Sequence, residues 1–166
     1  MKVDDDHLYH GAALIQIAEH PQFTTINSFK LTTGVSRSAY KINDEIGVYL
    51  KYASKPTPAF KEYVFTFRRE HLNELKEIAL KVEKVFMALV CVAAREICCL
   101  PYKPLTDLVA KRRAAKGAAE SQYNVLVTLP ARKSFRVYIN KPGAKKTMLG
   151  KPRIINRNDF PDKLFE

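Results

Sequence analysis

Cationic side chains gather toward the C-terminal end of this 166-residue sequence. Residues 1–100 carry a net charge of +1, whereas residues 101–166, with 15 basic and 5 acidic residues, carry +10. No acid occurs between Ser121 and Asn158, a stretch that contains nine Lys and Arg residues. Clustered cations bind polyanions because they release the counterions condensed along phosphate chains. The charge distribution therefore predicts a polyanion-binding surface in the C-terminal third.

One predicted strand and the loop after it supply most of the candidate contacts. Phe135, Val137 and Ile139 alternate as one face, which predicts a half-buried strand. Arg136 and Tyr138 then share the other face, where an arginine can pair with phosphate and an aromatic ring can stack on a base. A surface of ordinary solvated lysines is the competing interpretation. The residues predicted to bind nucleic acid or another polyanion are Arg132, Lys133, Arg136, Tyr138, Lys141, Lys145, Lys146 and Lys151.

A second set of residues could hold a divalent metal ion. Glu19 ends the first predicted helix, and Asp44 and Glu45 form a predicted turn. Lys51 lies near the end of the strand that follows. Carboxylates bind Mg²⁺, and a nearby lysine can position an attacking water. An ordinary turn and a solvated lysine explain the same residues without any catalysis.

The predicted order of helix, three strands ending in a lysine, helix and strand resembles the core of the PD-(D/E)XK, or restriction-endonuclease-like, family. The resemblance covers roughly residues 8–93. It implies a divergent Mg²⁺-dependent nuclease that uses Glu19, Asp44 or Glu45, and Lys51. In this sequence Tyr49 occupies the position where the family carries an acid, two residues before the lysine.

Other segments, at 8–12, 46–52, 63–67 and 88–100, resemble parts of small uncharacterised bacterial proteins, and this resemblance implies no activity. The sequence has no nucleophile elbow, phosphate-binding glycine loop or His-Glu-x-x-His motif. His7 and His10 lie beside Asp6 at a spacing that metal ligands can have, but exposed histidines near a helix start explain them equally. The sequence therefore favours a non-enzymatic binding protein with no resident metal or cofactor.

Hydrophobic periodicity predicts the elements that must position these residues. Leu8, Ala12, Ile15 and Ala18 fall on one face of the first helix, and Leu14 and Ile17 widen this stripe, so we expect the helix to pack on a sheet. We expect one α+β domain over residues 1–166, with a single mixed, largely antiparallel sheet. The predicted helices span 8–19, 71–84 and 104–117. The predicted strands span 23–32, 39–42, 46–52, 63–67, 85–93, 97–100, 125–129 and 135–139, with a short one at 154–155, a turn at 34–38 and a basic loop at 141–151.

The remaining expectations concern location and association. The longest apolar run, Val85–Ala94, is ten residues, well short of the roughly 20 that a membrane-spanning helix needs. No apolar leader segment precedes the acids at 4–6, so we expect a cytoplasmic protein without membrane contact. Three cysteines without metal-site spacing suit buried positions in a reducing compartment. A homodimer formed through an edge of the 124–139 hairpin is a further alternative.

Overall fold

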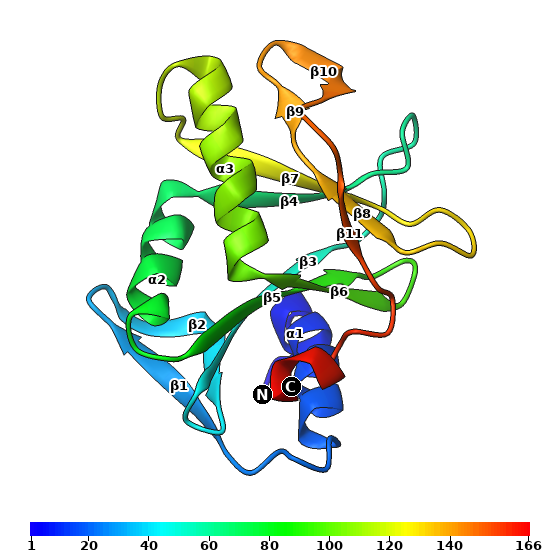
Figure 1. Ribbon diagram of the computed structural model, residues 1–166. Helices are drawn as coiled ribbons and strands as arrows, with labels where there is room; N and C mark the ends of the chain where they lie inside the picture. Colours follow the sequence, from blue (N-terminus) through cyan, green and yellow to red (C-terminus); the bar gives the residue numbers. More distant parts are fainter.

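The computed structural model describes the whole chain, Met1–Glu166, and shows an α+β fold with three α-helices, eleven strands and a short 3₁₀-helix (Figure 1). The helices are α1 (Asp5–Ala18), α2 (Arg69–Ala79) and α3 (Tyr102–Lys116), and the 3₁₀-helix is η1 (Asp162–Phe165). The predicted fold class is confirmed. The strands form three sheets in place of the single sheet expected, and the four-stranded sheet covers the central core from the side opposite the five-stranded one.

The five-stranded sheet has the order β1-β2-β3-β5-β6 and contains most of the N-terminal half. Its strands are β1 (Ile26–Leu31), β2 (Gly34–Ile42), β3 (Ile46–Ala53), β5 (Lys84–Cys91) and β6 (Glu96–Pro101). Only β3 and β5 are parallel, and the other pairs are antiparallel. The apolar run in β5 lies between β3 and β6 and is buried on both faces, as its continuous hydrophobicity predicts.

The second sheet is antiparallel and has four strands in the order β11-β8-β7-β4. These are β4 (Tyr63–Arg68), β7 (Gln122–Thr128), β8 (Phe135–Tyr138) and β11 (Arg153–Ile155). A separate two-stranded hairpin joins β9 (Asn140–Lys141) to β10 (Ala144–Met148). In Figure 1 this hairpin projects beyond the four-stranded sheet, near the C-terminal end of α3.

Two apolar cores lie on the two faces of the five-stranded sheet. The central core is enclosed by that sheet, the four-stranded sheet, α2 and α3. The outer core lies under α1 and η1 on the opposite face. Cys98 and Cys99 illustrate the division, because adjacent strand residues point to opposite faces: Cys98 lies in the central core and Cys99 in the outer one. All three cysteines are buried, and burial raises the pKa of the Cys91 and Cys99 thiols to about 12.

The first helix packs on the sheet as expected, but of the predicted apolar stripe only Ile17 and Leu14 contact the core. Ala13 and Ile17 are fully buried against the five-stranded sheet, with His10 nearby. Leu8 is 56% exposed and Ile15 is 60% exposed, so the prediction that they face the sheet is wrong. The helix has apolar residues on both sides, and its packing on the sheet selects one of them.

Two segments that were predicted to lack strands form strand pairs with a shift in register. Residues 34–38 extend β2, and Gly34 and Val35 pair with Leu31 and Lys30 of β1. The 141–151 segment, predicted as a loop, contains most of the β9–β10 hairpin. The hairpin of β7 and β8 is confirmed, but it offers no free edge, since β4 pairs with β7 and β11 pairs with β8. The hairpin therefore has no unpaired strand for the contact that was expected there, and a homodimer itself stays a prediction.

None of the helices combines the length and the apolar composition that crossing a membrane would require.

Candidate nucleic-acid interface

The predicted basic residues keep their charges free of internal partners. Six of the seven cations are exposed, Arg136 is half-buried, and none of the seven forms an ion pair. The exposed ones are Arg132, Lys133, Lys141, Lys145, Lys146 and Lys151. Their positive charge is thus available to an external anion.

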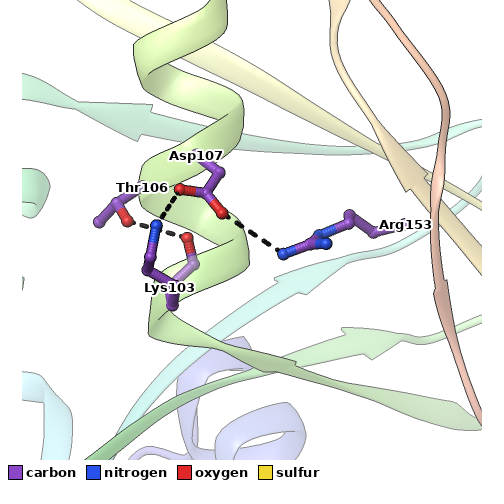
Figure 2. A network of polar contacts seen from close by, with 4 residues as sticks. All are labelled: Lys103, Thr106, Asp107 and Arg153. Carbon is purple, nitrogen blue, oxygen red and sulfur yellow. Dashed lines mark hydrogen bonds and ion pairs between the residues drawn. The ribbon is translucent and has the colours of Figure 1, made fainter.

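Some other cations of the C-terminal third are paired with acids. Asp107 on α3 contacts Lys103 Nζ at 2.5 Å and an Arg153 nitrogen at 3.4 Å, which ties β11 to α3 (Figure 2). Arg157 pairs with Glu96 at 3.4 Å. The few acids near the C-terminal third therefore compensate particular structural cations and leave the predicted binding residues uncompensated.

Two of these free lysines line a cavity on the surface of the molecule. This cavity of about 710 Å³ lies between the segment that connects β3 to β4, the outward face of β4 and β7, and the β9–β10 hairpin. Lys141 and Lys145 line its hairpin side. Val64 and Leu126, directly opposite one another on β4 and β7, supply apolar surface. Gln122 and Asn124 add amide groups along the same strand. The cavity thus combines cationic, amide and apolar surfaces.

Arg112 of α3 holds the start of the β9–β10 hairpin in place. Its Nε and Nη2 donate to the two carboxylate oxygens of Glu120 at 2.6 and 3.0 Å, and its Nη1 donates to the Asn140 carbonyl at 2.7 Å. The paired arginine lowers the pKa of the Glu120 carboxyl, so this acid stays ionised. The guanidinium of Arg112 thus makes a bidentate contact with Glu120 and a further hydrogen bond to Asn140. It links α3 to β9.

An exposed aromatic ring stands at the cavity beside a third lysine. Phe60 lines the cavity and is accessible to solvent, and Lys146 Nζ lies 5.4 Å from the centre of its ring. A ring next to a cation is the arrangement that stacks an unpaired base while binding its phosphate. Phe60 is not predictable from the sequence pattern, because it lies in an irregular segment about 80 residues away from Lys141.

The predicted binding residues do not all meet at one place. Arg132 and Lys133 belong to the turn before β8, whereas Lys141 follows that strand. The four residues of β8, which span about 10 Å, separate these two groups. Arg136 lies between them, opposite Thr128 on β7 and Ile154 on β11. The structure places Lys141 and Lys145 in the lining of the cavity and Lys146 beside Phe60 at its edge, whereas Arg132, Lys133 and Arg136 lie at or before β8.

Tyr138 is the one predicted contact residue that is not accessible. It lies on the outward face, as the alternation predicts, but the β3–β4 connection covers it and leaves it 8% exposed. Its hydroxyl donates to Glu62 Oε2, and burial together with this hydrogen bond raises the pKa of Tyr138. The phenol stays protonated and buried, so the expectation that its ring stacks on a base from the surface is wrong.

The residues proposed for a nuclease site lie apart. Asp44 and Glu45 precede β3, and Lys51 lies near its other end, so strand geometry separates Asp44 from Lys51 by roughly 20 Å. Glu19 caps α1, which packs on the outer core, whereas Lys51 contacts His71 of α2 on the opposite face of the sheet. These carboxylates and this lysine cannot act on one phosphate, because metal-assisted chemistry needs them within a few ångströms of it.

Comparison with known proteins does not identify relatives: no family model, no curated protein and no solved structure matches the chain.

Proposed function

We propose that this protein binds single-stranded nucleic acid along the outward face of its four-stranded sheet, with the cavity beside the β9–β10 hairpin as the centre of the interface. The observation that carries the proposal is the group of three unpaired lysines, Lys141, Lys145 and Lys146, gathered around a cavity that contains an exposed phenylalanine. The lysines would bind phosphates, and Phe60 would stack on a base.

Single strands fit this surface better than duplexes do. A cavity that holds a base requires the base to be unstacked and unpaired, and a flexible strand can present one. Arg136, Arg132 and Lys133 continue the positive charge along the sheet, away from the cavity. These three cations could bind successive phosphates of a strand that extends from the cavity.

Salt dependence tests the proposal directly. Binding of fluorescein-labelled oligonucleotides would be measured by fluorescence anisotropy between 50 and 300 mM salt, with the triple variant Lys141→Gln, Lys145→Gln, Lys146→Gln. Each lost phosphate contact lowers the slope of log K against log salt by about 0.7 for single strands, so we expect the slope to fall by about 2.

A matched control separates local contacts from net charge. Lys2→Gln, Lys30→Gln, Lys76→Gln removes the same three charges from exposed, unpaired lysines of the N-terminal half. This control should retain most of the affinity and the wild-type slope. Equal weakening in both triple variants, or no binding of any oligonucleotide at 50 mM salt, would refute the proposal.

Two earlier expectations stay predictions beside this one. A polyanion other than nucleic acid would bind the same lysines but would show no difference between oligonucleotides and an unstructured polyphosphate of equal charge. The cytoplasmic location is compatible with three buried free thiols, and no structural feature tests it.

A further inference from the structure

The cavity contains a carboxylate whose hydrogen bonding is incomplete. Glu62 lines the cavity, is only 8% exposed, and accepts one side-chain hydrogen bond, from the Tyr138 hydroxyl to its Oε2. No lysine or arginine lies within ion-pair distance of it. Its other oxygen, Oε1, accepts no hydrogen bond from the protein and is not enclosed, so it is accessible to a donor from a ligand in the cavity.

The remaining capacity of Glu62 is purely that of an acceptor. An ionised carboxylate accepts about four hydrogen bonds and donates none. Tyr138 cannot take up the surplus, since it has a single hydroxyl proton and already donates it. A ligand in the cavity that brought two adjacent N–H donors would complete this group.

The positive charge around the cavity limits which kinds of ligand can supply these donors. Lys141 and Lys145 line the same cavity as free cations, and they disfavour a cationic donor such as a guanidinium or an amine. The matching ligand therefore carries neutral N–H donors at one end and negative charge at the other. Among the nucleobases only guanine presents two neighbouring N–H donors, N1–H and the exocyclic N2–H, on its pairing edge.

We infer that the cavity selects guanine, with the Glu62 carboxylate accepting from N1–H and N2–H while Lys141 and Lys145 bind the attached phosphates. Adenine and cytosine each present an acceptor next to their amino group, which would face the carboxylate and repel it. Uracil presents one donor between two carbonyls. The inference rests on the proposed function, and it adds base selectivity to the binding of a single strand.

The test uses nine-nucleotide RNAs of uridine with one central guanosine, inosine or adenosine, labelled with fluorescein and measured by anisotropy with the full chain. Bidentate readout of a base is worth at least about fivefold in affinity. We expect the guanosine strand to bind at least about fivefold tighter than the adenosine strand. The inosine strand, which lacks the N2 amino group, should fall between them.

Glu62→Gln should abolish the preference for guanosine, because the amide replaces one acceptor oxygen by a donor. Tyr138→Phe removes only the hydroxyl and leaves the carboxylate, so it should keep the preference even if it weakens the fold. Glu83→Gln makes the same charge change at an exposed position outside the cavity and should behave as wild type.

Competition with free GMP and AMP distinguishes the source of the base. Displacement of the guanosine strand by GMP at concentrations close to those of the strand itself would identify a free nucleotide as the ligand. Displacement only at far higher concentrations would identify the strand.

The results separate the two proposals. Equal affinity for the guanosine, inosine and adenosine strands would overturn the guanine inference and leave single-strand binding intact. A guanosine preference that survives Glu62→Gln would also overturn it, since Glu62 would not be the reader. Failure of every strand to bind would overturn both.

Discussion

At the scale of single residues, Lys51 has the least ordinary environment in the protein. Its Nζ lies 3.2 Å from His71 Nδ1 and 4.9 Å from the centre of the Phe67 ring, and it forms no ion pair. Burial, and secondarily the charge of Arg68, lowers the pKa of Lys51 to about 8, although Glu74 opposes the shift. His71 Nδ1 also accepts the backbone N–H of Arg68, which suits a neutral imidazole.

Replacing this lysine should stabilise the protein at neutral pH. Charging Lys51 costs free energy in the folded state below pH 8, and this cost disappears as the pH rises from about 8 toward 10.5, where the unfolded chain holds the extra proton. Lys51→Met should therefore raise the free energy of unfolding by about 1–2 kcal/mol at pH 7, after allowance for partial exposure. Urea unfolding at pH 7 and pH 10 measures the difference, which should shrink at pH 10.

The exposed Lys76 of α2 provides the control. Lys76→Met should change the free energy of unfolding by less than about 0.5 kcal/mol at either pH. A stabilisation by Lys51→Met that is equal at pH 7 and pH 10 would show that the lysine charge is not its cause.

At the scale of elements, the central core depends on the close approach of α2 to β3. A Cβ atom placed on Gly47 of β3 would lie 2.8 Å from Ile78 Cγ2 and 3.2 Å from Val82 Cγ2. Ile78 is fully buried, so it has little room to move away. Glycine at this position thus sets the distance between helix and sheet.

Gly47→Ala should consequently destabilise the protein, because the added methyl group overpacks the contact between strand and helix. We expect a loss of about 1–3 kcal/mol in the free energy of unfolding, measured by urea denaturation. Gly11→Ala is the matched change in α1, where a Cβ meets no atom within 4 Å, and it should stabilise the helix by roughly 0.5–1 kcal/mol. Equal effects at the two glycines would contradict the close approach.

Hydrophobic periodicity predicts the buried face of a strand better than that of the first helix. The alternation of Phe135, Val137 and Ile139 predicts the buried face of β8 correctly, since one face of a strand must meet the core. The pattern in α1 does not decide its face, because Leu8 and Ile15 form one apolar stripe while Ala13 and Ile17 form another. Which stripe is buried depends on where the helix meets the sheet, and local periodicity carries no such information.

The same limit applies to the candidate site. The charge distribution locates the basic segment but not its ion pairs, because Arg153 and Arg157 of the acid-free stretch pair with Asp107 and Glu96, which lie far from them in the sequence. The cavity itself is built from segments near residues 57–64, 112–126 and 139–145. Phe60 and Glu62 belong to the segment that connects β3 to β4. They line the same cavity as Lys145, which is more than 80 residues away in the sequence, so local sequence patterns do not predict their proximity.

At the scale of the whole molecule, the basic C-terminal third is tied to the N-terminal sheet by its last residues. After β11 the chain returns to the outer core, where Phe160 and Leu164 pack with Ala13 and Ile17 of α1. The Phe165 ring stacks on His20 with the ring centres 4.1 Å apart. Both ends of the chain therefore close the same core, which favours unfolding of the two sheets in one cooperative transition.

Leu164 provides the test of this closure. It is 0% exposed, so Leu164→Ala removes buried methyl groups and leaves a cavity, which should cost about 2–4 kcal/mol in the free energy of unfolding. Leu80→Ala is the control, since Leu80 is 85% exposed and its loss should cost less than about 0.5 kcal/mol. Because η1 reaches the N-terminal sheet, Leu164→Ala should shift the whole urea transition to lower concentration with an unchanged slope, when followed by far-UV circular dichroism and by tyrosine fluorescence. A separate early transition would instead show that the C-terminal segment unfolds on its own and that the basic surface does not depend on it.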